Sequence, residues 1–313
     1  MQTLSQHLAL MLALAAITTS AARAELIYGV TDEAIPTLVR FDSASPEVST
    51  IIGPTGIATL RAIDFRPVNG MLYGLDFNTT SFAAQLYTID LTTGAATPIF
   101  APVTLTGASS STRVSIDFNP VSGLIRVVTG NGSSFRINPD TGALTPDTTF
   151  AYAAGDPSEA SNPPEIVGVA YTNNFPGATS TTLYAYDFNL DNGDTITRVG
   201  DIGGSPLSPN TGQMFTVGGL GGPLAFRGDV GFDISGLTGL AYLNLDEFNS
   251  LTFEDEFYTV NLSTGAATFL GTTTDVDLLD ISVAPVPEPS TIGLVVIGML
   301  GLVAAARRRQ AVS

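Results

Sequence analysis

The sequence predicts an all-β fold, a β-propeller of five four-stranded blades, and three observations lead to it. First, the 313 residues read as short strands between turns of Gly, Pro, Asn, Asp and Thr, with no helical period before the C-terminal tail. Second, strand types recur in a fixed order about every 50 residues, the signature of a repeat architecture. Third, the two ends of the repeat region are incomplete in complementary ways, which predicts one blade shared by both ends.

The innermost strand of each blade is predicted from a motif in which an Asp precedes a turn Gly by six positions. The turn itself is Pro-x-x-Gly or Gly-x-x-Gly, in which Pro presets φ and Gly accepts a positive φ, so the strand runs into a hairpin. The copies are RAIDFRPVNG (Arg61–Gly70), VSIDFNPVSG (Val114–Gly123) and VGFDISGLTG (Val230–Gly239).

The second strand follows at once and has a large side chain at one common position. The residues there are Tyr28, Tyr73, Tyr184, Tyr242 and, in the remaining copy, Arg126. Regular recurrence favours packing between blades, and a sugar-stacking surface is the alternative.

The third and fourth strands are predicted to form a hairpin with a Thr-Gly turn. The copies are LYTIDLTTGAAT (Leu86–Thr97), FRINPDTGALT (Phe135–Thr145) and FYTVNLSTGAAT (Phe257–Thr268). Gly94, Gly142 and Gly265 are expected in the left-handed conformation that such a tight turn requires. A degenerate copy of the whole unit covers Glu165–Gly219.

The termini are predicted to close the ring. Leu278–Ala284 resembles a first strand without followers, and Glu25–Gly53 supplies second, third and fourth strands without a first. We therefore expect the C-terminal strand to pair with Leu26–Val30. A ring of six blades, an open β-solenoid and a two-sheet sandwich are the alternatives.

The N-terminus has the pattern of a signal peptide over residues 1–24. Leu8–Ile17 is an apolar run, and Ala22 and Ala24 form a small-x-small cleavage site, so the mature chain is expected to begin at Glu25. A membrane anchor that is retained is the alternative. The predicted propeller domain then covers residues 25–284.

The C-terminal tail, residues 285–313, has three parts. Pro287, Glu288 and Pro289 precede an apolar run, Thr291–Ala306, which is followed by three arginines, Arg307–Arg309. A helix over this run would span roughly 24 Å, a short transmembrane helix, and the arginines are a cytoplasmic stop.

Two family resemblances follow from these motifs. The tail resembles the PEP-CTERM sorting tail of Gram-negative bacteria, which implies export, a transient inner-membrane anchor, and cleavage near the Pro-Glu-Pro by an exosortase-type protease. The LY-x-ID and TG-x-x-T strand motifs resemble a bacterial family of domains of unknown function in exported, propeller-like proteins. The second resemblance implies a fold and export, and no activity.

Composition excludes several function classes. The chain has 29 acidic residues against 12 Lys and Arg, a net charge of −17, so nucleic acid is not an expected partner. It has no Cys, and its single His, His7, lies in the predicted signal peptide. Ser-His-Asp and Cys-His nucleophiles and the usual zinc sites are therefore excluded.

The first candidate site is a ring of Asp side chains on the innermost strands. Asp64, Asp117, Asp233 and Asp280 are aligned at matching positions, with Gly168 in the fifth copy. They are predicted ligands of Ca²⁺ or Mg²⁺ at the central channel. Two alternatives stay open, the acid and base of a five-bladed glycosidase and acceptors of backbone hydrogen bonds or arginine ion pairs.

The second candidate site is the run DFNLDNGDT, with oxygen ligands at alternate positions. Its candidate Ca²⁺ ligands are Asp187, Asn189, Asp191 and Asp194. Gly193 comes one place later than a calcium loop requires, and a solvated turn is the alternative. The run Glu254-Asp255-Glu256 is predicted to be a charged loop.

These observations predict an exported cell-surface or extracellular-matrix protein acting as a non-catalytic structural or binding module. Extracellular polysaccharide or a matrix protein is the expected partner, and the membrane is contacted only through the tail. The alternative is a carboxylate- or metal-dependent polysaccharide hydrolase at the propeller channel.

Overall fold

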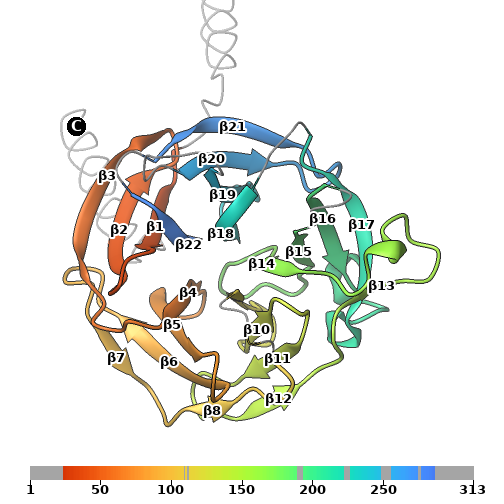
Figure 1. Cartoon of the computed structure of the whole chain (residues 1–313), viewed down its shortest axis with the longest axis horizontal. Coiled ribbons are helices and arrows are strands. Elements are labelled where there is room, and N and C mark those ends of the chain that lie inside the picture. Colours follow the sequence, from red (N-terminus) through yellow and green to blue (C-terminus); the bar gives the residue numbers. More distant parts are fainter. Residues whose placement is uncertain are drawn as a thin grey trace, which may run out of the picture.

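The computed structural model describes residues 24–108, 110, 113–188, 193–221, 226–247, 255–273 and 276–285, with only the backbone at 226–229 and 247. Five antiparallel sheets stand around a common axis, with β4, β14, β18 and β22 near the middle and β3, β7, β12, β17 and β21 at the rim (Figure 1). The predicted five-bladed propeller is confirmed. The predictions for Ala22, for Pro287, Glu288 and Pro289, and for the tail helix lie outside the described residues.

The first blade is built from both ends of the chain, as predicted. Its strands run in the order β22 (Leu278–Val283), β1 (Leu26–Thr31), β2 (Thr37–Asp42) and β3 (Ser45–Pro54). Strand β22 pairs antiparallel with β1, and Tyr28 lies opposite Ser282. The ring is therefore closed by three N-terminal strands and one C-terminal strand.

The other four blades follow in chain order, each with its first strand innermost. Blade 2 contains β4 (Leu60–Arg66), β5 (Met71–Asn78), β6 (Ala83–Ile89) and β7 (Ala96–Pro98), with β8 (Val103–Thr104) also paired to β6. Blade 3 contains β9 (Val114–Phe118), β10 (Ile125–Thr129), β11 (Ser134–Ile137) and β12 (Leu144–Pro146). Blade 5 contains β18 (Phe226–Ile234), β19 (Ala241–Glu247), β20 (Asp255–Val260) and β21 (Ala267–Thr272).

Blade 4 departs from the four-stranded pattern. To β14 (Ile166–Tyr171), β15 (Leu183–Asp187), β16 (Thr195–Val199) and β17 (Gln213–Gly219) it adds β13 (Ala151–Tyr152), which pairs parallel with β17 at the outer edge. Three short 3₁₀ helices lie in the adjoining loops: η1 (Glu159–Ser161), η2 (Ile202–Gly204) and η3 (Pro209–Thr211). Among the described helices, none combines the length and apolarity that a membrane crossing requires.

The repeated turns have the predicted conformation. Gly94, Gly142 and Gly265 have φ values of 78°, 73° and 79°, the left-handed region that a residue with a Cβ rarely adopts. This conformation lets the third strand of each blade return directly as the fourth.

The recurrent tyrosines pack between blades. The rings of Tyr28 and Phe65, in blades 1 and 2, meet edge to face with centroids 5.4 Å apart. Tyr73 of blade 2 makes the same contact with Phe118 of blade 3, at 5.0 Å. Such pairs add to the apolar area buried between neighbouring sheets, so the packing interpretation is supported.

Arg126 replaces tyrosine at this position in blade 3 and is buried. Its guanidinium donates to the Tyr171 hydroxyl at 2.9 Å, to Ser134 Oγ at 2.7 Å and to Asp147 Oδ2 at 2.8 Å. A buried cation is tolerated only with such a complete set of acceptors. Arg126 therefore joins blades 3 and 4 by polar contacts where the other blades use a ring.

Glu25, the expected first residue of the mature chain, is buried against blade 5. Its carboxylate accepts hydrogen bonds from Thr238 Oγ1 and the Tyr242 hydroxyl, both at 2.8 Å, and its backbone N–H donates to Ser43 Oγ at 2.9 Å. These bonds fasten the start of the domain between blades 5 and 1.

Candidate functional site

The strand register identifies which residues surround the axis. In every blade one residue of the innermost strand lies opposite the recurrent Tyr or Arg position of the second strand. The five pairs are Ser282 with Tyr28, Asp64 with Tyr73, Asp117 with Arg126, Ala170 with Tyr184, and Asp233 with Tyr242. We call Asp64, Asp117, Ala170, Asp233 and Ser282 the hub.

This register corrects the sequence alignment at two strands. Asp280 pairs with Val30, two residues before Ser282, and Gly168 pairs with Tyr186, two residues before Ala170. Because side chains alternate along a strand, a two-residue offset keeps the same face but moves the side chain to another level along the axis. The equivalent of Asp64 in blade 1 is therefore Ser282, and in blade 4 it is Ala170.

Hub side chains bond the innermost strands of four blades to the next blade. The Phe118 N–H donates to Asp64 Oδ2 at 2.7 Å, the Val283 N–H to Asp233 Oδ2 at 2.6 Å, and the Phe65 N–H to Ser282 Oγ at 3.2 Å. In each case the donor is the residue that follows the neighbouring hub residue. The backbone N–H of Tyr171 is likewise directed to Asp117.

Only blade 4 lacks an acceptor at the hub, because Ala170 has no polar atom. The N–H of Ile234, which would be its partner, donates instead to Asp233 Oδ1 at 2.6 Å. One level away along the axis, Asp280 Oδ2 accepts from the Ile63 N–H at 2.8 Å, so Asp280 also joins two blades. At that level blade 4 has Gly168, and Phe232 excludes a larger residue there, since a Cβ at position 168 would lie 2.8 Å from Phe232 Cβ.

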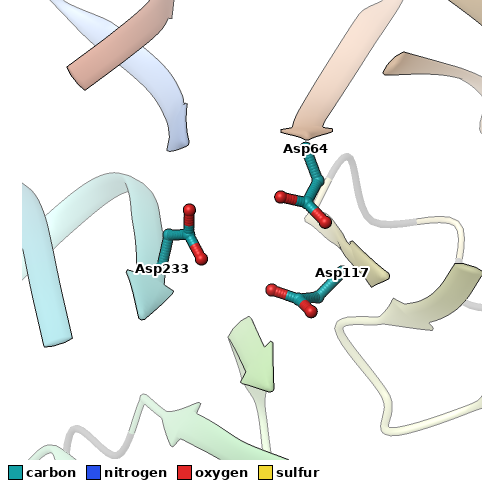
Figure 2. A group of neighbouring side chains, drawn as sticks. All are labelled: Asp64, Asp117 and Asp233. Carbon is teal, nitrogen blue, oxygen red and sulfur yellow. The ribbon is translucent and has the colours of Figure 1, made fainter. Parts of the chain in front are cut away.

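The three hub carboxylates are enclosed and close together. Asp64, Asp117 and Asp233 are 2%, 1% and 2% exposed, and one oxygen from each lies within 4.8 Å of the others. Figure 2 shows the three side chains pointing from separate strands toward a common centre. Asp280 is not in this group.

Ionisation of all three hub carboxyl groups is unfavourable. Burial, followed by the charge of Asp233, raises the pKa of Asp64 well above its ordinary value. Burial, with the charges of Asp64 and Asp233, raises the pKa of Asp117 in the same direction. Burial also raises the pKa of Asp233. An ion or protons must therefore offset the charge.

The second sequence-predicted site is only partly described. Asp187 ends β15 and is buried, and its oxygens accept from the Tyr152 hydroxyl and the Glu165 N–H, both at 2.7 Å. Asp194 accepts from the Tyr186 hydroxyl at 2.6 Å. Asn189 and Asp191 lie outside the described residues. Both oxygens of Asp187 thus already have protein partners.

One acidic cluster was missed by sequence reasoning. Asp246, Asp255 and Asp277 bring oxygens within 4.8 Å of one another, although they lie at the end of β19, at the start of β20 and just before β22. The sequence analysis predicts a charged loop at Asp255. In the structure Asp255 is buried, and its carboxylate accepts a hydrogen bond from the Leu278 N–H at 2.8 Å. No local motif links three residues so far apart in the chain.

A pocket of about 650 Å³ lies where the innermost strands end. Phe65 and Val283, which directly follow the hub residues Asp64 and Ser282, are part of its wall. The rest comes chiefly from the loops after β4, β14 and β18, including Val68, Phe175 and Leu237, and from Pro285. The pocket is thus the mouth of the axis on the face where the described chain ends.

The chain belongs to the family described as Domain of unknown function (DUF4394), whose model matches residues 37–282. A PEP-CTERM protein-sorting motif matches residues 285–309. The motif marks the chain as an exported protein that the exosortase sorting machinery recognises. No curated protein matches the chain.

Solved structures resemble the chain at low identity. A structural genomics protein of unknown function from Bacteroides thetaiotaomicron aligns with a TM-score of 0.47 and 13% identity over 85% of this chain and 62% of its own. A chain of a nidogen/laminin complex aligns with a TM-score of 0.46 and 10% identity over 84% of this chain and 98% of its own. Neither likeness bears on activity or ligand.

Proposed function

We propose that the protein acts at the cell surface or in the extracellular matrix as a non-catalytic binding module. The burial of the hub carries this proposal. A glycosidase needs two carboxyl groups about 5–10 Å apart that face a bound sugar. Asp64, Asp117 and Asp233 are at most 2% exposed, and two of them accept backbone hydrogen bonds from neighbouring blades. A polysaccharide chain has no access to them.

The axial pocket supports a binding role. Val68, Phe175 and Leu237 expose large apolar side chains on its wall, and clustered exposed apolar side chains mark interaction sites. We infer that an extracellular polysaccharide or matrix protein binds here.

The position of the tail relates binding to processing. Pro285 lines the pocket, and the sorting motif begins at that residue. While the tail is attached, the face with the pocket is the face that continues into the membrane-directed segment. We infer that cleavage near Pro287–Pro289 makes this face available to the extracellular partner.

The test compares binding with hydrolysis in one experiment. The exported protein is incubated with extracellular polysaccharide in millimolar Ca²⁺, and co-sedimentation and the release of reducing ends are measured in parallel. We expect no reducing ends, and we expect Phe175→Ser to weaken any binding, whereas Ile51→Ser, at an exposed position on β3, leaves it unchanged. Reducing ends that disappear in Asp64→Asn would establish the hydrolase instead. If the polysaccharide does not bind, the matrix protein remains the expected partner.

A further inference from the structure

The hub brings three acidic side chains together, and no arginine among the described residues forms an ion pair with them. Asp64, Asp117 and Asp233 come from three blades, and their oxygens lie within 4.8 Å of one another. Every ion pair found among the described residues uses a carboxylate outside the hub, at Asp140, Asp147, Glu165 or Asp201. Like charges buried together without a counter-charge are unfavourable by several kcal/mol per ion. The ionised hub therefore requires a positive ion.

One oxygen of the hub points independently to such an ion. Asp64 and Asp233 accept hydrogen bonds on both of their oxygens, from Ser282, Phe118, Val283 and Ile234. Asp117 Oδ1 accepts none from the described residues, although its side chain is 1% exposed and points toward the other two carboxylates (Figure 2). An acceptor buried without a partner costs about 1–3 kcal/mol and is rare in folded proteins. Coordination to a cation would satisfy it.

We propose that the hub binds one Ca²⁺ ion through Asp64, Asp117 and Asp233, with the Ser282 hydroxyl beside it. All of these donors are hard oxygens, the ligands that Ca²⁺ prefers. One oxygen from each carboxylate lies within 4.8 Å of the others, so a single ion with oxygen contacts of about 2.3–2.6 Å can touch all three. The ion would join blades 2, 3 and 5 at the axis.

The pocket lies on the side from which an ion would enter. Phe65 and Val283 line it, and they directly follow Asp64 and Ser282 in the chain. Ca²⁺ takes 6–8 oxygen ligands, and water from this side would complete the coordination that the carboxylates begin. Asp280 lies at another level and stays an acceptor for the Ile63 N–H.

The experiment measures Ca²⁺ binding to the exported protein after chelator treatment. Calorimetric titration and metal analysis should give one tightly bound Ca²⁺ at the hub. At 100 times the Kd, Ca²⁺ should raise the melting temperature by roughly 5–10 °C, since a ligand bound only to the native state stabilises it. Mg²⁺ at the same concentration should raise it less.

Two matched variants locate the ion. Asp117→Asn removes one charge at the hub and should abolish the Ca²⁺-dependent shift, while Asp277→Asn, in the second acidic cluster, should preserve it. The reverse pattern would place the ion in the second cluster and overturn the proposal. A wild-type protein whose melting temperature and metal content do not respond to Ca²⁺ would overturn it as well and would show that protons neutralise the hub. The wild-type result decides even if Asp117→Asn fails to fold.

Discussion

The carboxylate of Asp64 accepts a 2.7 Å hydrogen bond from the backbone N–H of Phe118, which joins the innermost strand of blade 2 to that of blade 3. The two strands belong to separate sheets, so no ladder of backbone hydrogen bonds connects them. Hub side chains take over this task, and the same relationship links Asp233 to Val283 and Ser282 to Phe65. The hub residues Asp64 and Asp233 therefore stabilise the contacts between neighbouring blades.

Ser282 should contribute measurably to stability. Its hydroxyl accepts from the Phe65 N–H and donates to Asp64 Oδ1 at 2.9 Å, so Ser282→Ala leaves two buried polar atoms without these bonds. We expect a loss of about 1–3 kcal/mol in the free energy of unfolding, measured by urea denaturation. The control, Ser122→Ala in the exposed turn after β9, should change it by less than about 0.5 kcal/mol. Equal urea midpoints for the two variants would show that the hydrogen bonds of Ser282 do not stabilise the contact between blades.

Arg126, whose ion-pair partner is buried, should be far more sensitive to substitution than Arg66, whose partner is exposed. Arg126→Met keeps much of the volume but leaves Asp147 with Arg136 alone, and we expect a loss of about 3 kcal/mol. In the control, Arg66→Met breaks a pair with Asp140, which is 63% exposed, and should cost at most about 1 kcal/mol. Thermal or urea unfolding measures both. Similar losses would mean that the buried network of Arg126 is not formed.

Asp187 should make stability depend on pH between about 4 and 6. Burial raises its pKa from 3.8 to about 6. In this window the unfolded chain ionises the carboxyl while the folded chain keeps it protonated, so the contribution to stability that is complete below pH 3.8 is lost as pH rises through 6. Asp187→Asn should flatten the curve by about 2–3 kcal/mol across this window. Urea unfolding at several pH values measures the difference, and identical slopes for variant and wild type would contradict it.

The blade count and the closure were predictable because short sequence motifs determine the local turns that define each blade. A Thr-Gly turn after a strand specifies a hairpin, and Gly94 adopts the expected left-handed conformation. The two incomplete ends of the repeat complement one another, which predicts a closed ring. The pairing of Tyr28 with Ser282 is the result.

The membership of the hub was not predictable in the same way. The sequence Leu-Leu-Asp-Ile in β22 resembles Ala-Ile-Asp-Phe in β4, and this similarity aligns Asp280 with Asp64. Pairing across the sheet, which sequence does not display, makes Ser282 the equivalent residue. Nothing in the sequence marks Ser282 or Ala170 as the residue that takes the place of the aspartate. The cluster of Asp246, Asp255 and Asp277 was missed because the ring topology, and no motif, brings it together.

The central claim is that the hub is closed and structural, and amide hydrogen exchange at Phe118 and Val283 tests it most directly. Both N–H groups donate to buried hub carboxylates, so they should exchange only when the propeller unfolds, at least about a thousandfold more slowly than unprotected amides. Mass spectrometry or NMR of the exported protein at neutral pH gives this ratio. Exchange close to unprotected rates would show that the Phe118 and Val283 N–H groups do not keep their hydrogen bonds to Asp64 and Asp233, and it would contradict a closed, structural hub.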